Sequence, residues 1–165
     1  MSRAFVKEED QEEAPFIPPR AALPPGATNY VTATGRQQLL DEKKALEAEK
    51  AGLALEDEAE QRKALAVING KLQLLAERIS SAQVLSQPES PDEVRFGARV
   101  TLNVVGKNVK QQFQIVGVDE ADVKQQKIAF VSPIARAVTG KKVGEVAQLK
   151  LGNEVRELEV LEIAY

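Results

Sequence analysis

The chain has 165 residues, of which 43% are apolar and 28% charged, and its 22 basic and 25 acidic side chains leave a net charge of −3. It contains no cysteine and no histidine, which excludes disulfides, thiol nucleophiles, zinc sites with the usual ligands and every histidine-based general base. Aromatic residues make up only 4%, so we expect no deep aromatic ligand pocket. The slight negative charge argues against broad, non-specific nucleic-acid binding.

The length suits one ordinary domain or two small ones. No apolar run approaches the roughly 20 residues that span a bilayer, and no signal peptide opens the chain. We therefore expect a cytoplasmic protein with no membrane partner.

Residues 1–29 are predicted to form a disordered tail. Proline at positions 15, 18, 19, 24 and 25 opposes both helices and sheet ladders, and the segment has too few apolar residues for a core of its own. The alternative is a docking peptide that packs elsewhere on the protein through Phe5, Val6, Phe16 and Ile17. An acidic block precedes the prolines: Glu8, Glu9, Asp10, Glu12 and Glu13.

Residues 30–85 are predicted to form an antiparallel helical hairpin, a short coiled coil. Leucine recurs every seven residues at Leu39, Leu46 and Leu53, which is coiled-coil spacing. Pairing Leu39 with Leu72 and Leu46 with Leu65 gives one register within a single chain, which favours a monomer over a parallel dimer. The second half of the segment has apolar residues at alternating steps of three and four: Leu65, Ile68, Leu72, Leu75, Ile79 and Ala82.

The turn of this hairpin, between helices expected at residues 35–54 and 57–82, is acidic. Negative charge at the start of a helix is stabilised by the helix dipole, so these acids have a structural explanation. The acids are Glu56, Asp57, Glu58 and Glu60.

A linker at residues 86–91 leads to a predicted C-terminal domain at residues 92–165. Its apolar residues alternate as in strands, and turns at 106–108 and 152–153 join neighbouring strands. Ser132 and Pro133 have the residue types of a helix N-cap and first position. The domain is therefore predicted as an antiparallel sheet of about five strands with one short helix, and the chain as α+β. The strands are expected at residues 99–104, 112–118, 127–131, 146–151 and 155–163.

Four short stretches of the C-terminal domain resemble the bacterial GreA/GreB transcript-cleavage factors, GreB more than GreA. The order of helical hairpin, proline-containing linker and small sheet domain is also similar to that family. The stretches are Phe96-Gly97-Ala98, Phe113-Gln114-Ile115-Val116-Gly117, Ser132-Pro133-Ile134-Ala135-Arg136-Ala137-Val138 and Lys142-Val143-Gly144-Glu145.

The resemblance implies an FKBP-like C-terminal domain that docks on RNA polymerase at the mouth of its secondary channel. Ser132, Pro133, Ile134, Arg136 and Val138 are then the docking residues, although Ile134 and Val138 can equally be core residues. The hairpin enters the channel, and the tip acids help to hold a magnesium ion shared with the polymerase. The polymerase itself cuts the RNA, so the chain is not expected to be an enzyme or to carry its own cofactor. Nucleic acid is contacted only indirectly, within the elongation complex.

The sequence departs from the family in three places. The tip motif of a glycine-aspartate pair followed by Ser-Glu-Asn-Ala is absent, and an ungapped comparison places Ala51 and Ala54 at the two key acids. The hairpin is shorter by about two turns per arm, roughly 10 Å of reach. Val131 replaces the acid that usually precedes the Ser-Pro pair.

These observations lead to the expectation of a secondary-channel transcription elongation regulator. One alternative is a channel competitor that blocks Gre-type factors without cleavage. The other is an interaction module unrelated to polymerase. Prolyl-isomerase activity is disfavoured, because that reaction uses an aromatic-lined pocket and fold alone does not carry function.

Overall fold

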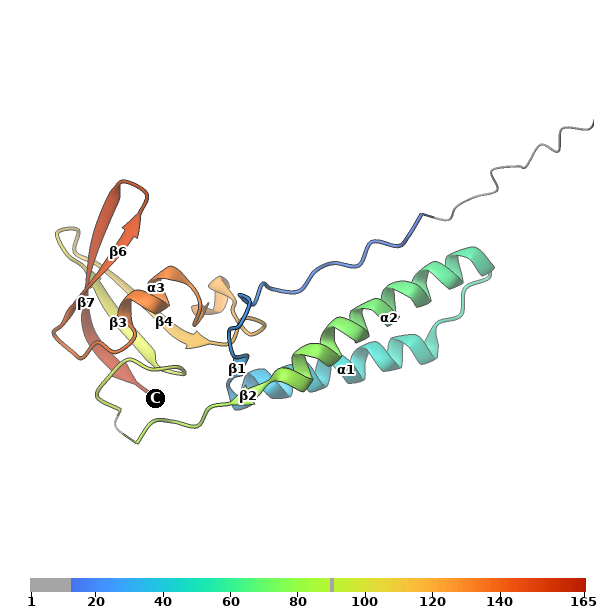
Figure 1. The fold of residues 1–165 in the computed structure, drawn as a ribbon, viewed down its shortest axis with the longest axis horizontal. Coiled ribbons are helices and arrows are strands. Elements are labelled where there is room, and N and C mark those ends of the chain that lie inside the picture. The colour runs from blue at the N-terminus through green and yellow to red at the C-terminus, as the bar shows by residue number, and fades with distance from the viewer. Residues whose placement is uncertain (1–12, 90) are drawn as a thin grey trace, which may run out of the picture.

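The computed structural model describes residues 13–89 and 91–165. A helical hairpin and a curled sheet lie one after the other along the long axis, and the hairpin turn lies at the end farthest from the sheet (Figure 1). Within the described residues, no helix combines the length and the apolar character that a membrane crossing needs. The predicted α+β class, a helix pair followed by a sheet with one short helix, is confirmed.

The hairpin consists of α1 (Ala33–Gly52) and α2 (Glu58–Ser81). Its apolar seam contains the buried side chains of Leu39, Leu46 and Leu75, with Leu72 and Ile79 packed against them. Leu39 and Leu72 therefore meet in one cluster, as the predicted register requires. Leu65 lies only partly buried, nearer the turn.

The base of the hairpin is closed by a short parallel ladder between β1 (Tyr30–Val31) and β2 (Gln83–Val84). The buried side chain of Asn29 donates from Nδ2 to the Arg78 carbonyl at 3.0 Å and to Ser81 Oγ at 3.1 Å. These bonds satisfy groups at the C-terminal end of α2 that the helix itself leaves unpaired. The ladder and Asn29 hold the two helix ends together where they approach the sheet.

The C-terminal sheet has five strands in the order β5-β4-β3-β7-β6. Three of its four pairings are antiparallel, as predicted, but β4 and β5 run parallel. The difference arises because residues 117–126, which include the 3-10 turn η1 (Val123–Gln125), carry the chain back before β5 begins. The strands are β3 (Arg99–Val104), β4 (Val109–Val116), β5 (Lys127–Ala129), β6 (Val146–Leu151) and β7 (Glu154–Ala164).

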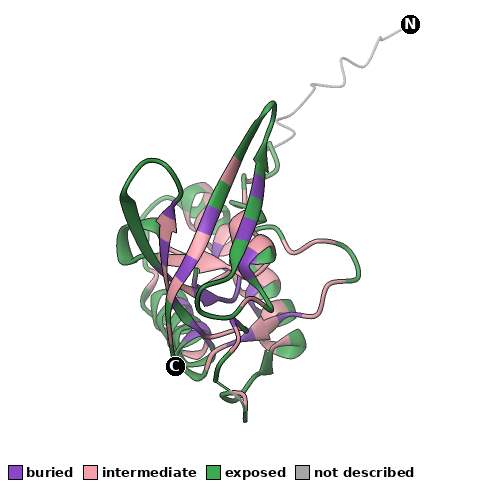
Figure 2. Cartoon of the chain, turned by 90° about the vertical axis from the view of Figure 1, so that its left-hand side faces the viewer, coloured by how far each residue is buried: buried purple, intermediate pink, exposed green. Residues whose placement is uncertain are grey.

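The core of this domain lies between one face of the sheet and the helix α3 (Pro133–Val138). Alternate residues of β3 (Val100, Leu102 and Val104) point into it, and Figure 2 shows the resulting bands of buried and exposed residues along the strands. Such alternation is the signature of strands that are buried on one face.

The hairpin joins the sheet domain through a buried carboxylate, Glu120, in the loop after β4. Its Oε2 accepts a hydrogen bond of 2.5 Å from the Thr32 hydroxyl, and its Oε1 lies 3.3 Å from Lys127 Nζ. Thr32 is also the N-cap of α1, accepting from the Gly35 amide at 2.9 Å. The carboxylate therefore sits at the N-terminal end of α1, where the helix dipole favours negative charge.

A close backbone contact and three aromatic rings also connect the hairpin base to the sheet domain. A Cβ at Gly117 would lie 2.6 Å from the Tyr30 carbonyl oxygen, so the strand and the hairpin base approach as only glycine allows. The Tyr30 ring packs on Phe96 and Phe130 of the sheet domain, with centroids 6.1 and 5.6 Å away. These distances fall in the range of favourable aromatic pairs.

We predict opposite effects for two glycine-to-alanine changes in α1. Alanine is favoured over glycine in a helix by about 1 kcal/mol. A Cβ at Gly52 meets nothing within 4 Å, so Gly52→Ala should raise the free energy of unfolding by up to about 1 kcal/mol. A Cβ at Gly35 would lie 2.6 Å from Glu120 Oε2, so Gly35→Ala should displace the carboxylate and lower that free energy by about 1–2 kcal/mol.

Urea unfolding of the two variants beside the parent protein measures both effects. If Gly35→Ala stabilises the protein as much as Gly52→Ala does, the contact between α1 and Glu120 is not present in solution.

We further predict that Tyr165 ionises above its ordinary range. Its hydroxyl donates to the Glu93 carbonyl at 2.6 Å and accepts from the Arg95 amide at 2.9 Å. Burial raises the pKa of Tyr165 above its reference value of 10.0. Because the folded pKa is raised, the protonated Tyr165 phenol contributes to the stability of the folded protein. This contribution is complete below pH 10 and is lost as the pH rises through the folded pKa.

The sequence has two tyrosines, so a Tyr30→Phe variant leaves Tyr165 as the only ionising phenol. Ultraviolet titration of tyrosinate should give a midpoint above that of the same variant in denaturant. Equal midpoints would contradict the prediction.

Candidate functional site

The hairpin turn is organised by Gln61, a residue that the sequence pattern did not single out. Its Oε1 accepts from the Leu55 amide at 2.7 Å, and its Nε2 donates to the Leu53 carbonyl at 3.1 Å. One side chain from the first turn of α2 thus fixes the backbone that leaves α1. No local motif marks such a reach across the turn, since an amide at this helix position is ordinary on an exposed surface.

The four tip acids are all exposed, but they do not have equal roles. Asp57 is the N-cap of α2, and its Oδ1 accepts from the amides of Ala59 at 2.8 Å and Glu60 at 3.3 Å. Glu58 and Glu60 stand in the first turn of the helix, where its dipole favours acids. The structural explanation therefore accounts fully for Asp57 and partly for Glu58 and Glu60. Glu56 precedes the cap.

Carboxylate oxygens are the ligands that Mg²⁺ prefers, and it is typically held by one or two of them together with groups from a substrate. In residues 13–89 and 91–165, no three acidic, histidine or cysteine side chains are grouped to hold a metal. Glu56, Glu58 and Glu60 thus have the chemistry to contribute a ligand to an ion, but not the arrangement to enclose one.

The predicted docking residues lie on and beside α3. Ser132 is the N-cap, with its Oγ accepting from the Ala135 amide at 3.3 Å, and Pro133 occupies the first turn. Pro133 and Arg136 are exposed, whereas Ile134 is half-buried and packs against the domain core. Of these residues, Arg136 lines a groove together with Tyr30 of the hairpin base.

The prediction that Val138 is a docking residue is wrong. Val138 is 0% exposed and belongs to the core cluster, because it lies one helical turn after Ile134 on the face that packs against the sheet. The alternative that this residue belongs to the core is the one that the structure supports.

Beside α3 lies an apolar groove of about 610 Å³, between the hairpin base, the linker and the sheet domain. Tyr30, Phe96 and Phe130 line it, together with Leu85 and Arg136. The low aromatic content predicted no such aromatic surface. Three rings that are far apart in sequence form it, and sequence spacing gave no sign that they meet.

Comparisons with known proteins identify relatives of the sheet domain. Residues 87–165 match the family model described as transcription elongation factor, GreA/GreB, C-term. A protein named transcription elongation factor GreA from Hyphomonas neptunium is 40% identical over 99 residues, and its namesake from Neisseria meningitidis serogroup A is 38% identical over 100 residues. Each alignment covers 59% of this chain and 63% of the relative, so the chain spans less than two thirds of those proteins.

Among solved structures, the crystal structure of GreA factor homolog 1 of Thermus thermophilus is 21% identical, with a TM-score of 0.40. That comparison covers 84% of this chain and 100% of the other. The sequence matches are the stronger finding, and they include the helix α3 and the strands around it. Residues 87–165, which include α3 and the five-stranded sheet, are thus similar in sequence to the GreA/GreB C-terminal domain.

Proposed function

We propose that this protein is a bacterial, cytoplasmic regulator of transcription elongation that binds RNA polymerase and acts through its secondary channel. The observation that carries the proposal is the combination, in one chain, of a domain similar to the GreA/GreB C-terminal domain and a helical hairpin whose acidic turn points away from it. In this proposal the sheet domain docks at the channel mouth, and the hairpin extends into the channel.

The surface of α3 is the docking site in this proposal. Pro133 and Arg136 are exposed there, and the adjacent groove offers apolar surface between a cationic side chain and three rings. Exposed arginine beside aromatic surface has the composition that is enriched where proteins bind one another. Val138 contributes only by holding α3 against the sheet.

The hairpin determines what the bound factor does. An α1 of 20 residues is about 30 Å long at 1.5 Å per residue. Glu56, Glu58 and Glu60 stand exposed at its far end. If they reach a magnesium ion in the polymerase, they can contribute carboxylate ligands to it, while bond cleavage in RNA stays with the polymerase.

A second mechanism is favoured by the commitment of Asp57 to the α2 cap and by the shortness of the arms. In that mechanism the hairpin occupies the channel without delivering a ligand and excludes other factors. We favour this channel-blocking mechanism, and both mechanisms require the same docking.

We predict a stable complex with core RNA polymerase that depends on α3. Arg136→Glu should weaken binding about tenfold or more, since an exposed arginine at the centre of an interface is commonly worth at least 1.4 kcal/mol. Lys110→Glu, at an exposed position on β4, makes the same charge change away from α3 and should leave the affinity within about twofold. Fluorescence anisotropy with labelled protein and core polymerase measures both.

Absence of a complex at micromolar concentration would sink the polymerase proposal and favour an unrelated interaction module. If Arg136→Glu and Lys110→Glu weaken polymerase binding equally, the docking surface is not centred on α3.

We also predict that the tip acids are not needed for the effect on the polymerase. The variant Glu56→Gln/Glu58→Gln/Glu60→Gln removes the free carboxylates but keeps the Asp57 cap, so the turn stays folded. In a backtracked elongation complex, the parent protein should compete with a GreA protein and reduce RNA cleavage, and the triple variant should do the same.

Cleavage that the parent protein stimulates and the triple variant does not would establish the metal-assisting mechanism instead. The variant Asp57→Asn, whose amide oxygen still caps the helix, then tests whether the capping acid takes part.

A further inference from the structure

Residues Ile17–Ala21, which precede the hairpin, run along α2 and contact both the hairpin and the sheet domain. We call this segment the strap. It falls in the region that the sequence assigned to a tail, whose first 12 residues lie outside the described part of the chain. Its contacts are of two kinds, one apolar and one ionic, and they hold different elements.

The apolar contact places Ile17 against Gly70 on α2. A Cβ at Gly70 would lie 2.0 Å from Ile17 Cδ1 and 2.8 Å from its Cγ1. Glycine in the middle of a helix costs about 1 kcal/mol relative to alanine, so its presence here needs a reason. The absence of a side chain at Gly70 makes the room that Ile17 occupies.

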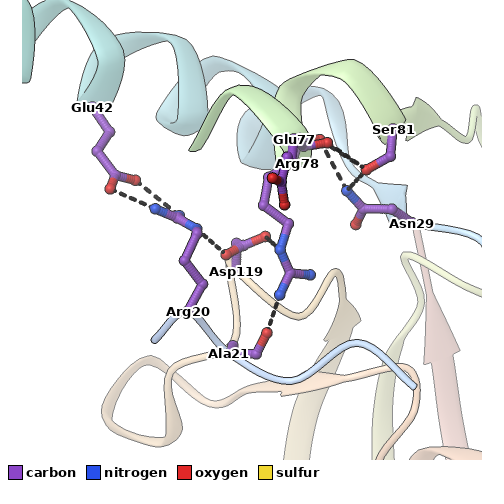
Figure 3. A network of polar contacts seen from close by, with 8 residues as sticks. All are labelled: Arg20, Ala21, Asn29, Glu42, Glu77, Arg78, Ser81 and Asp119. Carbon is purple, nitrogen blue, oxygen red and sulfur yellow. Dashed lines mark hydrogen bonds and ion pairs between the residues drawn. The ribbon is translucent and has the colours of Figure 1, made fainter. Parts of the chain in front are cut away.

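The ionic contact is made by Arg20 and joins two elements that are distant in sequence (Figure 3). Its Nη1 and Nη2 donate to the two carboxylate oxygens of Glu42 on α1, at 2.7 and 3.0 Å. Its Nε donates to Asp119 Oδ1 at 2.9 Å, in the loop after β4. One guanidinium therefore bridges the hairpin and the sheet domain with three charged hydrogen bonds.

A second arginine completes the arrangement from α2. Arg78 Nη2 donates to the carbonyl of Ala21 in the strap, and Arg78 Nε lies 3.7 Å from Asp119 Oδ2. The Asp119 side chain is only 8% exposed and lies between the two guanidiniums. Hydrogen bonding to Glu42, followed by the charge of Asp119, raises the pKa of Arg20, so this side chain stays charged.

We propose that the strap fixes the direction of the hairpin relative to the sheet domain, with Arg20 as its positioning residue. Without Arg20, the nearly buried Asp119 keeps only the longer contact with Arg78, and Glu42 loses the guanidinium that connects it to Asp119. A nearly buried carboxylate that loses its closest partner favours conformations that return it to water. The hairpin then takes up other directions about the joint at Glu120.

The proposal concerns the free protein and stands whether or not polymerase is the partner. If the proposed function holds, the same contact aims the hairpin at the channel, because the sheet domain is the part that docks.

Distances between two spin labels on the full chain test the proposal directly, since the protein has no native cysteine. One pair of exposed sites, Ala51→Cys near the turn and Lys150→Cys on β6, measures the direction of the hairpin. A second pair, Ala51→Cys and Ser80→Cys, lies within the hairpin and reports whether it stays folded.

In the parent protein we expect one narrow distribution for each pair. Arg20→Ala should broaden the Ala51–Lys150 distribution and raise the population of other directions about tenfold, the factor that one charged hydrogen bond is worth. Arg20→Lys keeps the charge but not the bidentate guanidinium, so the width of its Ala51–Lys150 distribution should lie between those of the parent protein and Arg20→Ala. The pair within the hairpin should not change, and Lys44→Ala, at an exposed position on α1, should alter neither distribution.

Gly70→Ala tests the apolar contact without changing a charge. It should broaden the Ala51–Lys150 distribution less than Arg20→Ala does, because Ile17 must move while Arg20 stays in place. In an Ile17→Ala background the same change should add no further broadening.

An Ala51–Lys150 distribution that Arg20→Ala leaves unchanged would overturn the proposal. Broadening of both pairs together would also overturn it, since Arg20 would then hold the hairpin itself rather than its direction.

Discussion

Two adjacent carboxylates, Asp119 and Glu120, carry the connection between the halves of this molecule. Both side chains are at most 8% exposed, and burying a charge is costly unless partners compensate for it. The partners come from elsewhere in the chain: Thr32, the strap and α2 on one side and Lys127 on the other. The hairpin therefore keeps a defined direction only while its base supplies these donors.

The sequence predicted the parts better than their connection. Heptad leucines and alternating strand residues identified the hairpin and the strands of the five-stranded sheet, because local periodicity reports the face that a residue buries. The two-residue strands β1 and β2 were not predicted. The parallel pairing of β4 and β5 was not predicted, since it depends on the path of residues 117–126. The carboxylates of that loop gave no signal, because an acidic pair in a polar loop is normally solvated.

The candidate site shows the same division. Ser132 as a helix cap and the acidic turn followed from local residue types, and Asp57 proved to be a cap for that reason. Val138 and Ile134 share one face of α3, and sequence alone left open whether that face is buried; the structure places Val138 in the core. The groove of Tyr30, Phe96 and Phe130 could not be predicted, because its rings meet only in the folded chain. The role of Gln61 could not be predicted either, because its hydrogen bonds cross the hairpin turn.

A small rotation at the base of the hairpin produces a large displacement at its tip. An arm about 30 Å long that turns by about 10° at its base moves its end by about 5 Å. A magnesium ion accepts oxygen ligands only at about 2.0–2.1 Å and in a strict geometry, whereas filling a channel tolerates such a displacement. A hairpin held rigidly at Asp119 and Glu120 can either contribute a ligand to the ion or occupy a channel. A hairpin that rotates freely at its base can only occupy a channel. If the proposed function holds, the ion pairs at the base therefore limit what the acids at the turn are able to do.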